Sequence, residues 1–199
     1  MARAPRKRSA TETEIKLRVR DLAEAIGRIR AIGARGGESV FEENTLYDTP
    51  GSDLRRGGCL LRLRTERKAA GRAARGVLTA KMPVAGDPAA KRYKRKAERE
   101  AILREPARWP GALRSLGFRA GFRYQKYRTA FRLGGVHLDL DETPVGNFLE
   151  LEGPPRAIDR VARRLGYRPK DYIRENYWGL YAADCRARGQ APGNMVFAR

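Results

Sequence analysis

The chain has 199 residues, which suits one domain with short tails and leaves little room for a second full domain. Its 43 Lys and Arg residues against 23 Asp and Glu residues give a formal net charge of +20, which calls for an anionic partner such as nucleic acid, polyphosphate, a nucleotide or an anionic membrane. Only two cysteines occur, Cys59 and Cys185, and their distance in the sequence argues against a disulfide framework and a thiolate metal site.

The first ten residues are expected to form a disordered basic arm, because no apolar run follows their cluster of arginine and lysine. No stretch of the sequence reaches the length of a membrane span, so no membrane partner is expected. The cysteine usage is typical of a protein of the reducing cytoplasm. The pattern of strands and helices predicts one domain over residues 11–185 and a flexible tail over residues 186–199, which are rich in Gly and Pro.

After the basic arm, the sequence predicts strands with one apolar and one charged face. Residues 12–19 alternate strictly, which indicates a strand. One side holds Thr13, Ile15, Leu17 and Val19, and the other holds Glu12, Glu14, Lys16 and Arg18. The same two-faced pattern recurs at 60–64, 78–81, 126–133, 136–141 and 149–152, with weaker segments at 40–47 and 94–102. These segments predict about eight strands.

Helical segments interrupt the strands. The first opens with Asp21 and Glu24 in capping-box spacing, a second follows Pro110, and two more are expected at about 155–165 and 172–185. The first three end on the phrase Arg-x-x-Gly-x-Arg. Glycine there is expected to take the left-handed position that ends a helix.

The charged strand faces decide the expected architecture. For a single strand, an open sheet with a solvated polar face is the simpler interpretation. Repetition over the whole β region favours closure, in which the apolar faces pack outward against helices and the charged faces line a lumen. The sequence therefore predicts an α+β fold, with an antiparallel eight-stranded closed β tunnel and helices packed outside it.

Charges of each sign cluster along these faces. Carboxylates pair at alternate positions, where both can offer oxygen ligands to one hard cation such as Mg²⁺ or Mn²⁺: Glu12 with Glu14, Asp139 with Asp141, and Glu150 with Glu152. Between them come cations suited to phosphate oxygens: Lys16, Arg62 with Arg64, Lys81, and Lys126 with Arg128. Metals and cations around one cavity indicate a polyanionic substrate and phosphoryl chemistry. Relief of repulsion is expected to stabilise the metal-free protein when Glu150 or Glu152 is neutralised.

At this point the residues resemble a known family. Glu12-Thr-Glu14-Ile-Lys16 is similar to the Glu-x-Glu-x-Lys signature of the CYTH family, the triphosphate tunnel metalloenzymes. Further segments follow in the family's order: Leu46-Tyr-Asp-Thr-Pro50, Leu61-Arg-Leu-Arg64, Leu78-Thr-Ala-Lys81, Lys96-Ala-Glu98-Arg-Glu100, Lys126-Tyr-Arg128, Leu138-Asp-Leu-Asp141 and Phe148-Leu-Glu150-Leu-Glu152. The resemblance covers roughly residues 12–181. Lys96 departs from it, since arginine is more usual there.

The resemblance implies a tunnel that binds a triphosphate and one or two divalent ions, Mg²⁺ or Mn²⁺. Residues implied to contact the substrate are Lys16, Arg62, Arg64, Lys81, Glu98, Glu100, Lys126 and Arg128. Residues implied to bind metal are Glu12, Glu14, Asp139, Glu150 and Glu152. Glu12 and Glu14 are also implied to position the attacking water, and Lys170 resembles a catalytic lysine near the tunnel mouth.

Family members share this site but differ in chemistry, so alternatives remain. Hydrolysis of inorganic triphosphate or another small organic triphosphate ranks first, by a monomer or homodimer. Conversion of ATP to cyclic AMP and pyrophosphate, as in class IV adenylate cyclases, ranks second, because no His-Phe pair of the cyclase kind occurs near the N-terminus. A nucleic-acid-binding module ranks lower, since the carboxylate pairs would repel a phosphate backbone and no specific nucleic acid is expected.

Overall fold

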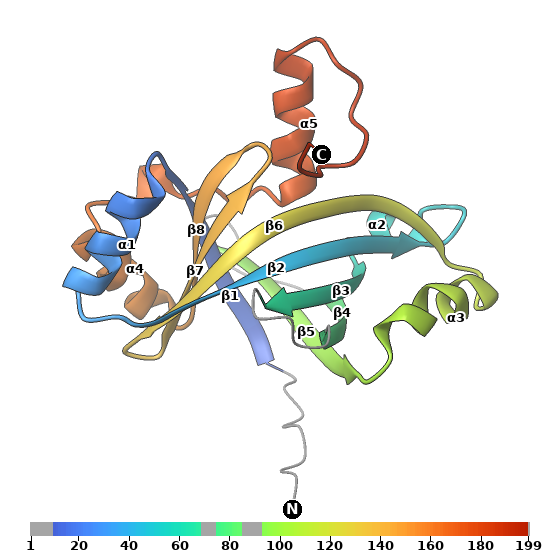
Figure 1. Cartoon of the computed structure of the whole chain (residues 1–199), viewed down its shortest axis with the longest axis horizontal. Helices are drawn as coiled ribbons and strands as arrows, with labels where there is room; N and C mark the ends of the chain where they lie inside the picture. Colours follow the sequence, from blue (N-terminus) through green and yellow to red (C-terminus); the bar gives the residue numbers. More distant parts are fainter. Residues whose placement is uncertain (1–9, 69–74, 85–92, 199) are drawn as a thin grey trace, which may run out of the picture.

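The strands form a closed antiparallel barrel of eight (Figure 1). The computed structural model describes residues 10–68, 75–84 and 93–198. Around the barrel the order is β1-β5-β4-β3-β2-β6-β7-β8. The strands are β1 Ala10–Val19, β2 Arg35–Asp48, β3 Leu60–Lys68, β4 Arg75–Pro83, β5 Lys94–Leu103, β6 Arg119–Leu133, β7 Val136–Thr143 and β8 Gly146–Glu152. The predicted fold class is thereby confirmed. The predicted basic arm lies outside the described residues, apart from Ala10, which begins β1.

Helices cover the outside of the barrel (Figure 1). In the described residues they are α1 Leu22–Ala31, α2 Asp53–Arg56, α3 Trp109–Ser115, α4 Pro155–Arg164 and α5 Tyr177–Ala187. The capping signal places α1 as expected, because Asp21 Oδ1 accepts a hydrogen bond from the Glu24 N–H at 2.7 Å. No helix among these residues has the length and apolarity that crossing a membrane requires.

The apolar strand faces pack outward against α1 and α4. Ile15 and Leu17 of β1 are 1% and 0% exposed, and they share one core with Ile29 of α1 and Ile158 of α4. Burial of such side chains contributes about 1.5–3 kcal/mol each, which is why the alternation fixes the faces of the strands. The charged faces must consequently point into the barrel.

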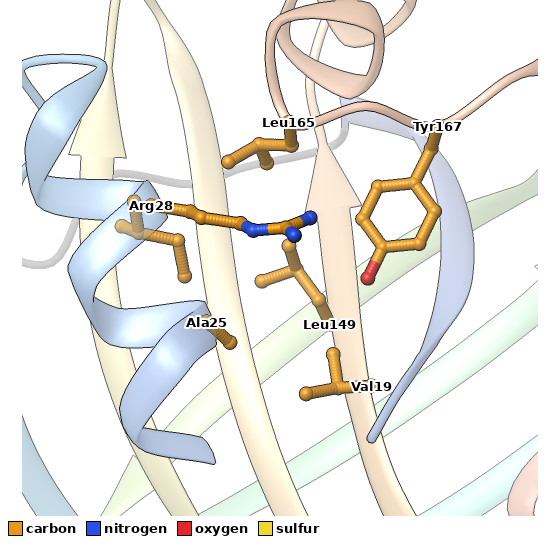
Figure 2. A pocket seen from close by; sticks show the side chains of 7 residues that line it. Val19, Ala25, Arg28, Leu149, Leu165 and Tyr167 are labelled. Atoms are coloured by element: carbon orange, nitrogen blue, oxygen red, sulfur yellow. The ribbon is translucent and has the colours of Figure 1, made fainter. Parts of the chain in front are cut away.

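Packing between α1 and the barrel is nearly complete. A pocket of about 10 Å³ remains, which is room for roughly one water molecule. Figure 2 shows Arg28 reaching from α1 across this pocket toward the ring of Tyr167. The pocket belongs to the helix–barrel packing and is separate from the barrel interior.

The last helix starts later than predicted. It begins at Tyr177 rather than near Tyr172, because the preceding residues are extended. Ile173 exchanges two backbone hydrogen bonds with Lys16 of β1, at 2.8 and 3.1 Å. These bonds occupy the edge of β1 beyond its pairing with β5, which ends at Glu14.

The segment after α5 contacts the barrel through Met195, which lies within the residues predicted to form a flexible tail. The pairing of β6 with β7 starts at Tyr127, so the edge of β6 before that residue lacks a strand partner from β7. Met195 fills it: its N–H donates to Arg123 O at 3.0 Å, and its carbonyl accepts from the Gln125 N–H at 2.9 Å. The Met195 side chain is 0% exposed. An exposed strand edge and an apolar side chain thus hold a segment whose Gly and Pro content suggested a tail.

Candidate active site

The charged strand faces line the barrel interior, which we call the lumen. Residues directly opposite in antiparallel strands share a face. Glu14 lies opposite Glu152, and Lys16 lies opposite Glu150. Two glutamate pairs from the two ends of the β region therefore meet at one wall, as the closed sheet requires.

Arg128 is the centre of the largest ion-pair group in the lumen. Its Nη1 lies 2.8 Å from Asp139 Oδ2, and its Nε and Nη2 each donate to Asp141 at 2.7 Å. It also pairs with Glu150, which accepts a second ion pair from Lys16 Nζ at 2.7 Å. Arg128 thus pairs with three carboxylates from β7 and β8, and loss of one member of such a buried group is destabilising.

Glu42 on β2 joins the opposite side of this group, and the sequence had assigned it no role. It is 1% exposed and lies 3.5 Å from Lys126 Nζ and 3.4 Å from Arg64 Nη1. Burial raises the pKa of Glu42, but the charges of Lys126, Arg128 and Arg64 outweigh burial and hold the pKa at about 2. Glu42 and Asn44 occupy alternate positions of the weak strand segment 40–47, and this spacing could have indicated that both face the lumen.

Arg62 and Arg64 of β3 form a cationic wall with partners on both sides. Arg62 donates to Thr79 Oγ1 at 3.2 Å and to the Tyr124 hydroxyl at 3.3 Å. Arg64 Nη2 lies 3.6 Å from Glu100 Oε1, which also accepts from Thr79 at 3.0 Å. The structure therefore brings the predicted residues Arg62, Arg64 and Glu100 together.

Two carboxylates pair with the ammonium group of Lys81, and the charge of Lys81 also acts on a third carboxylate, Glu152 of β8. Lys81 Nζ pairs with Glu12 and lies 3.0 Å from Glu98 Oε2. Burial and the hydrogen bond with Glu12 raise the pKa of Glu98 to about 8. Burial and the charge of Glu12 raise the pKa of Glu152 to about 7. Negative charge is therefore in surplus at this part of the lumen.

Glu14 pairs with a lysine, Lys94, that was not among the site residues predicted from the sequence. Lys94 of β5 pairs with Glu14 across the β1–β5 ladder. Burial raises the pKa of Glu14, but the charge of Lys94, with that of Lys16, outweighs burial and brings the pKa to about 2. Glu14 is thus ionised under all ordinary conditions.

A hard divalent cation suits the carboxylate group of Glu12, Glu98 and Glu152. Oxygen donors are what Mg²⁺ and Mn²⁺ prefer, and a dication would offset the surplus negative charge. Among residues 10–68, 75–84 and 93–198, no three His, Cys, Asp or Glu side chains are already arranged to hold a metal ion. Glu12 and Glu98 instead pair with Lys81. The fit therefore rests on the chemistry and charge of the donors.

Tyr177 of α5 bounds the lumen at one end, and it was not among the site residues predicted from the sequence. Its hydroxyl donates to Asp141 Oδ2 at 2.5 Å, and its ring lies 4.6 Å from Lys16 Nζ and 5.0 Å from Lys126 Nζ. Burial, reinforced by the charges of Asp141 and Glu150, raises the pKa of Tyr177 well above its usual value, so the phenol stays protonated. It packs in a cluster with Tyr124, Phe148 and Met195.

Two lysines of the expected site lie away from the buried charges. Lys170 is exposed on the 3-10 turn Pro169–Asp171, so its catalytic role stays a prediction. Lys96 donates to the backbone carbonyl of Gly58 at 2.9 Å, outside the ion-pair group of the lumen.

The fold is an eight-stranded antiparallel barrel whose lumen is lined by buried cations and carboxylates. The model of the CYTH domain matches residues 10–175, and the chain belongs to this family. Family membership confirms the resemblance found in the sequence. A search of curated proteins by sequence found no match.

Solved structures share the fold at low sequence identity. A "putative adenylate cyclase" from Vibrio parahaemolyticus has a TM-score of 0.74 at 20% identity and covers 87% of this chain and 98% of its own. A protein from Pyrococcus horikoshii has a TM-score of 0.73 at 24% identity, with 87% and 99% covered. A "putative adenylyl cyclase" from Hippeastrum, described as having a dominant triphosphatase activity, has a TM-score of 0.57 at 17% identity, with 91% and 97% covered.

Proposed function

We propose that the chain is a divalent-metal-dependent hydrolase that releases phosphate from a small triphosphate bound in the lumen, with inorganic triphosphate as the first candidate. The observation that supports this function is the density of buried cations. Lys16, Lys126 and Arg128 are 3%, 2% and 14% exposed, and carboxylates of the same lumen neutralise them. A polyanion that entered would replace those carboxylates as partner and release them for a metal ion.

The cations suit a chain of phosphates because they line several walls. Arg62 and Arg64 of β3 and Arg128 of β6 offer planar guanidinium groups that bind two phosphate oxygens at once. Lys81 of β4 and Lys126 of β6 add compact positive charge. Three phosphates in a row would thus meet donors along their length, whereas a single phosphate would leave most donors unused.

The family is metal-dependent in general, and the proposed ligands of the metal are Glu12, Glu14, Asp139, Glu150 and Glu152. Bound Mg²⁺ or Mn²⁺ would supply Lewis acidity to the phosphoryl group and lower the pKa of a water molecule. Glu12 and Glu14, on one face of β1, are proposed to orient the attacking water. The cations hold the phosphates in place and stabilise the charge that develops on the leaving phosphate.

Conversion of ATP to cyclic AMP is the second candidate, because structural neighbours carry the name of adenylate cyclases. Both reactions need a triphosphate held by cations and metal, and they differ in the attacking oxygen. The Hippeastrum neighbour, described with a dominant triphosphatase activity, supports ranking hydrolysis first.

Product analysis tests the proposal. Inorganic triphosphate, ATP and thiamine triphosphate are each incubated with Mg²⁺, Mn²⁺ or EDTA, and phosphate, pyrophosphate and cyclic AMP are quantified. We expect phosphate release from inorganic triphosphate that EDTA abolishes. Arg64→Ala should raise KM strongly, whereas Arg67→Ala, an exposed arginine of the same strand, should not. A rate that EDTA leaves unchanged refutes the metal-dependent mechanism, and cyclic AMP with pyrophosphate from ATP identifies a cyclase.

The proposed setting is the cytoplasm. Cys59 and Cys185 are both free thiols in the structure, and Cys185 is buried. Reduced cysteines are typical of that compartment. The proposed partner is the triphosphate itself, bound by a monomer or homodimer.

A further inference from the structure

Asn44 is a buried, uncharged side chain among the charges of the lumen. It lies on β2 two residues from Glu42, and its cross-strand neighbours are Arg64 of β3 and Tyr124 of β6. Its exposed fraction is 0%. Within the described residues, neither Oδ1 nor Nδ2 makes a hydrogen bond. The amide therefore offers a donor and an acceptor that the protein itself does not use.

Such an amide lowers the stability of the folded chain. A buried polar group that gives up its bonds to water without gaining others is destabilising, and a leucine of similar volume would avoid that loss. Thr79 shows the contrast. It is also 0% exposed, yet its hydroxyl accepts from Arg62 at 3.2 Å and donates to Glu100 at 3.0 Å. The ligand-free fold thus requires the hydroxyl of Thr79 but not the amide of Asn44.

Other polar atoms on the same wall also lack hydrogen bonds. They are Glu42 Oε2, two residues away on β2, and Arg62 Nε and Arg64 Nε on the adjacent strand β3. Glu42 Oε2 has an ion-pair contact with Lys126 Nζ at 3.5 Å. Unsatisfied donors and acceptors therefore gather where β2 meets β3, beside the guanidinium groups proposed to hold phosphate.

We propose that Asn44 is a ligand-binding residue, whose amide nitrogen donates a hydrogen bond to an oxygen of the bound triphosphate. This inference rests on the proposed function. Arg62 and Arg64 supply charge at the same wall, and the amide supplies a directional bond that adds no charge. It therefore needs no carboxylate to neutralise it when the lumen is empty of substrate. The carbonyl oxygen of the amide accepts a hydrogen bond from a water molecule that accompanies the ligand.

Two variants test the proposal: Asn44→Leu removes the donor at similar volume, and Asn44→Asp replaces it with an anion of the same shape. Binding of inorganic triphosphate is measured by calorimetry in EDTA and in Mg²⁺, and the melting temperature is measured without ligand. We expect both variants to bind triphosphate about tenfold more weakly or worse, since one hydrogen bond to a charged group is lost. Asn44→Leu should melt at or above the wild-type temperature.

Thr79→Val is the matched control, because it removes a lumen hydroxyl that has protein partners. It should lower the melting temperature, which shows that the measurement detects a lost lumen hydrogen bond. Wild-type affinity in Asn44→Leu overturns the inference, as does a melting temperature well below wild type, which indicates a structural role. If Asn44→Leu does not fold, wild-type affinity in Asn44→Asp overturns it. Absence of triphosphate binding by the wild-type protein in both buffers refutes the proposed function itself.

Discussion

Glu150 and Glu152 occupy alternate positions of β8 but have opposite electrostatic surroundings. Glu150 pairs with Lys16 and Arg128. Burial raises its pKa, but the charges of Lys16, Lys126 and Arg128 outweigh burial and hold the pKa well below its usual value. For Glu152, burial and the charge of Glu12 act together and raise the pKa to about 7. The expectation that neutralising either residue stabilises the metal-free protein therefore applies to Glu152 alone.

We expect Glu150→Gln to lower the stability of the metal-free protein by about 3 kcal/mol, because two buried cations lose a partner. Glu152→Gln should leave stability unchanged or raise it at pH 8, because it removes repulsion. Each variant should bind Mn²⁺ more weakly than wild type. Denaturant unfolding in EDTA and Mn²⁺ calorimetry check both effects. Equal stability changes in the two variants would contradict the assigned electrostatics, and wild-type Mn²⁺ affinity would contradict their role as ligands.

The Tyr177 hydroxyl offers a second test at a single residue. Tyr177→Phe keeps the ring between Lys16 and Lys126 but removes the hydrogen bond to Asp141. A bond to a charged acceptor contributes about 1.5–3 kcal/mol, and we expect stability to fall by that amount. Urea unfolding gives the value. Tyr181→Phe, on the same helix, is the control, since its hydroxyl accepts a 3.3 Å bond from the neutral Gly193 N–H instead of donating to a buried carboxylate. A larger loss of stability in Tyr181→Phe than in Tyr177→Phe would contradict the contribution assigned to the hydrogen bond between Tyr177 and Asp141.

At the scale of elements, strands with strict alternation could be predicted and those without it could not. In β1 the charged side chains face the lumen and the apolar ones face the helices, so its two faces are visible in the sequence. In β2 the outer face carries Glu43, which accepts from Gln125 of β6 at 3.0 Å. Because β2 has polar residues on both faces, its sequence does not alternate between apolar and polar residues. The lumen residues Glu42 and Asn44 are therefore hard to recognise from the sequence.

The residues of the candidate site also differ in whether the sequence could predict them. Residues on clearly alternating strands, such as Lys16, Arg128 and Glu150, could be assigned to one cavity because closure leaves their faces no other place. Tyr177 could not be assigned, because a helix gives no sign of which strand face it covers. Its contact with Asp141 depends on the extended residues that hold the start of α5 against β1.

The docked C-terminal segment yields a prediction at this scale. Met195→Ala should cost about 2–5 kcal/mol, because it leaves a cavity in the cluster of Tyr124, Phe148 and Tyr177. Val196→Ala, at a neighbouring residue that is 38% exposed, should cost much less and serves as the control. Chemical denaturation of both variants supplies the comparison. Equal small effects would show that the segment contributes little to the fold.

At the scale of the whole molecule, the charge is unevenly distributed. The chain carries a net charge of +20, yet carboxylates are in surplus around Lys81 inside the barrel. The excess of basic residues therefore lies outside the lumen. We expect it to attract nucleic acid nonspecifically, with an affinity that falls steeply as salt rises. In the lumen, by contrast, cations and carboxylates pair with one another.

The surplus of carboxylates makes the stability of the metal-free protein depend on pH. The pKa values of Glu98 and Glu152 rise from 4.5 to about 8 and about 7 on folding. Between pH 4.5 and these values the folded state therefore binds more protons than the unfolded state. Stability from this source is fully present below the unfolded pKa and is lost as pH rises through about 7 and 8.

We therefore expect the melting temperature in EDTA to fall as pH rises from 5 to 9, and to fall much less in the double variant Glu98→Gln with Glu152→Gln. Saturating Mg²⁺ should also flatten the decline, because a dication replaces the bound protons. Binding of the metal near pH 7 should release protons, which calorimetry in buffers of different ionisation enthalpy detects. A metal-free melting temperature that rises over this range would contradict the raised pKa values. An unchanged slope in the double variant would assign the dependence to other groups.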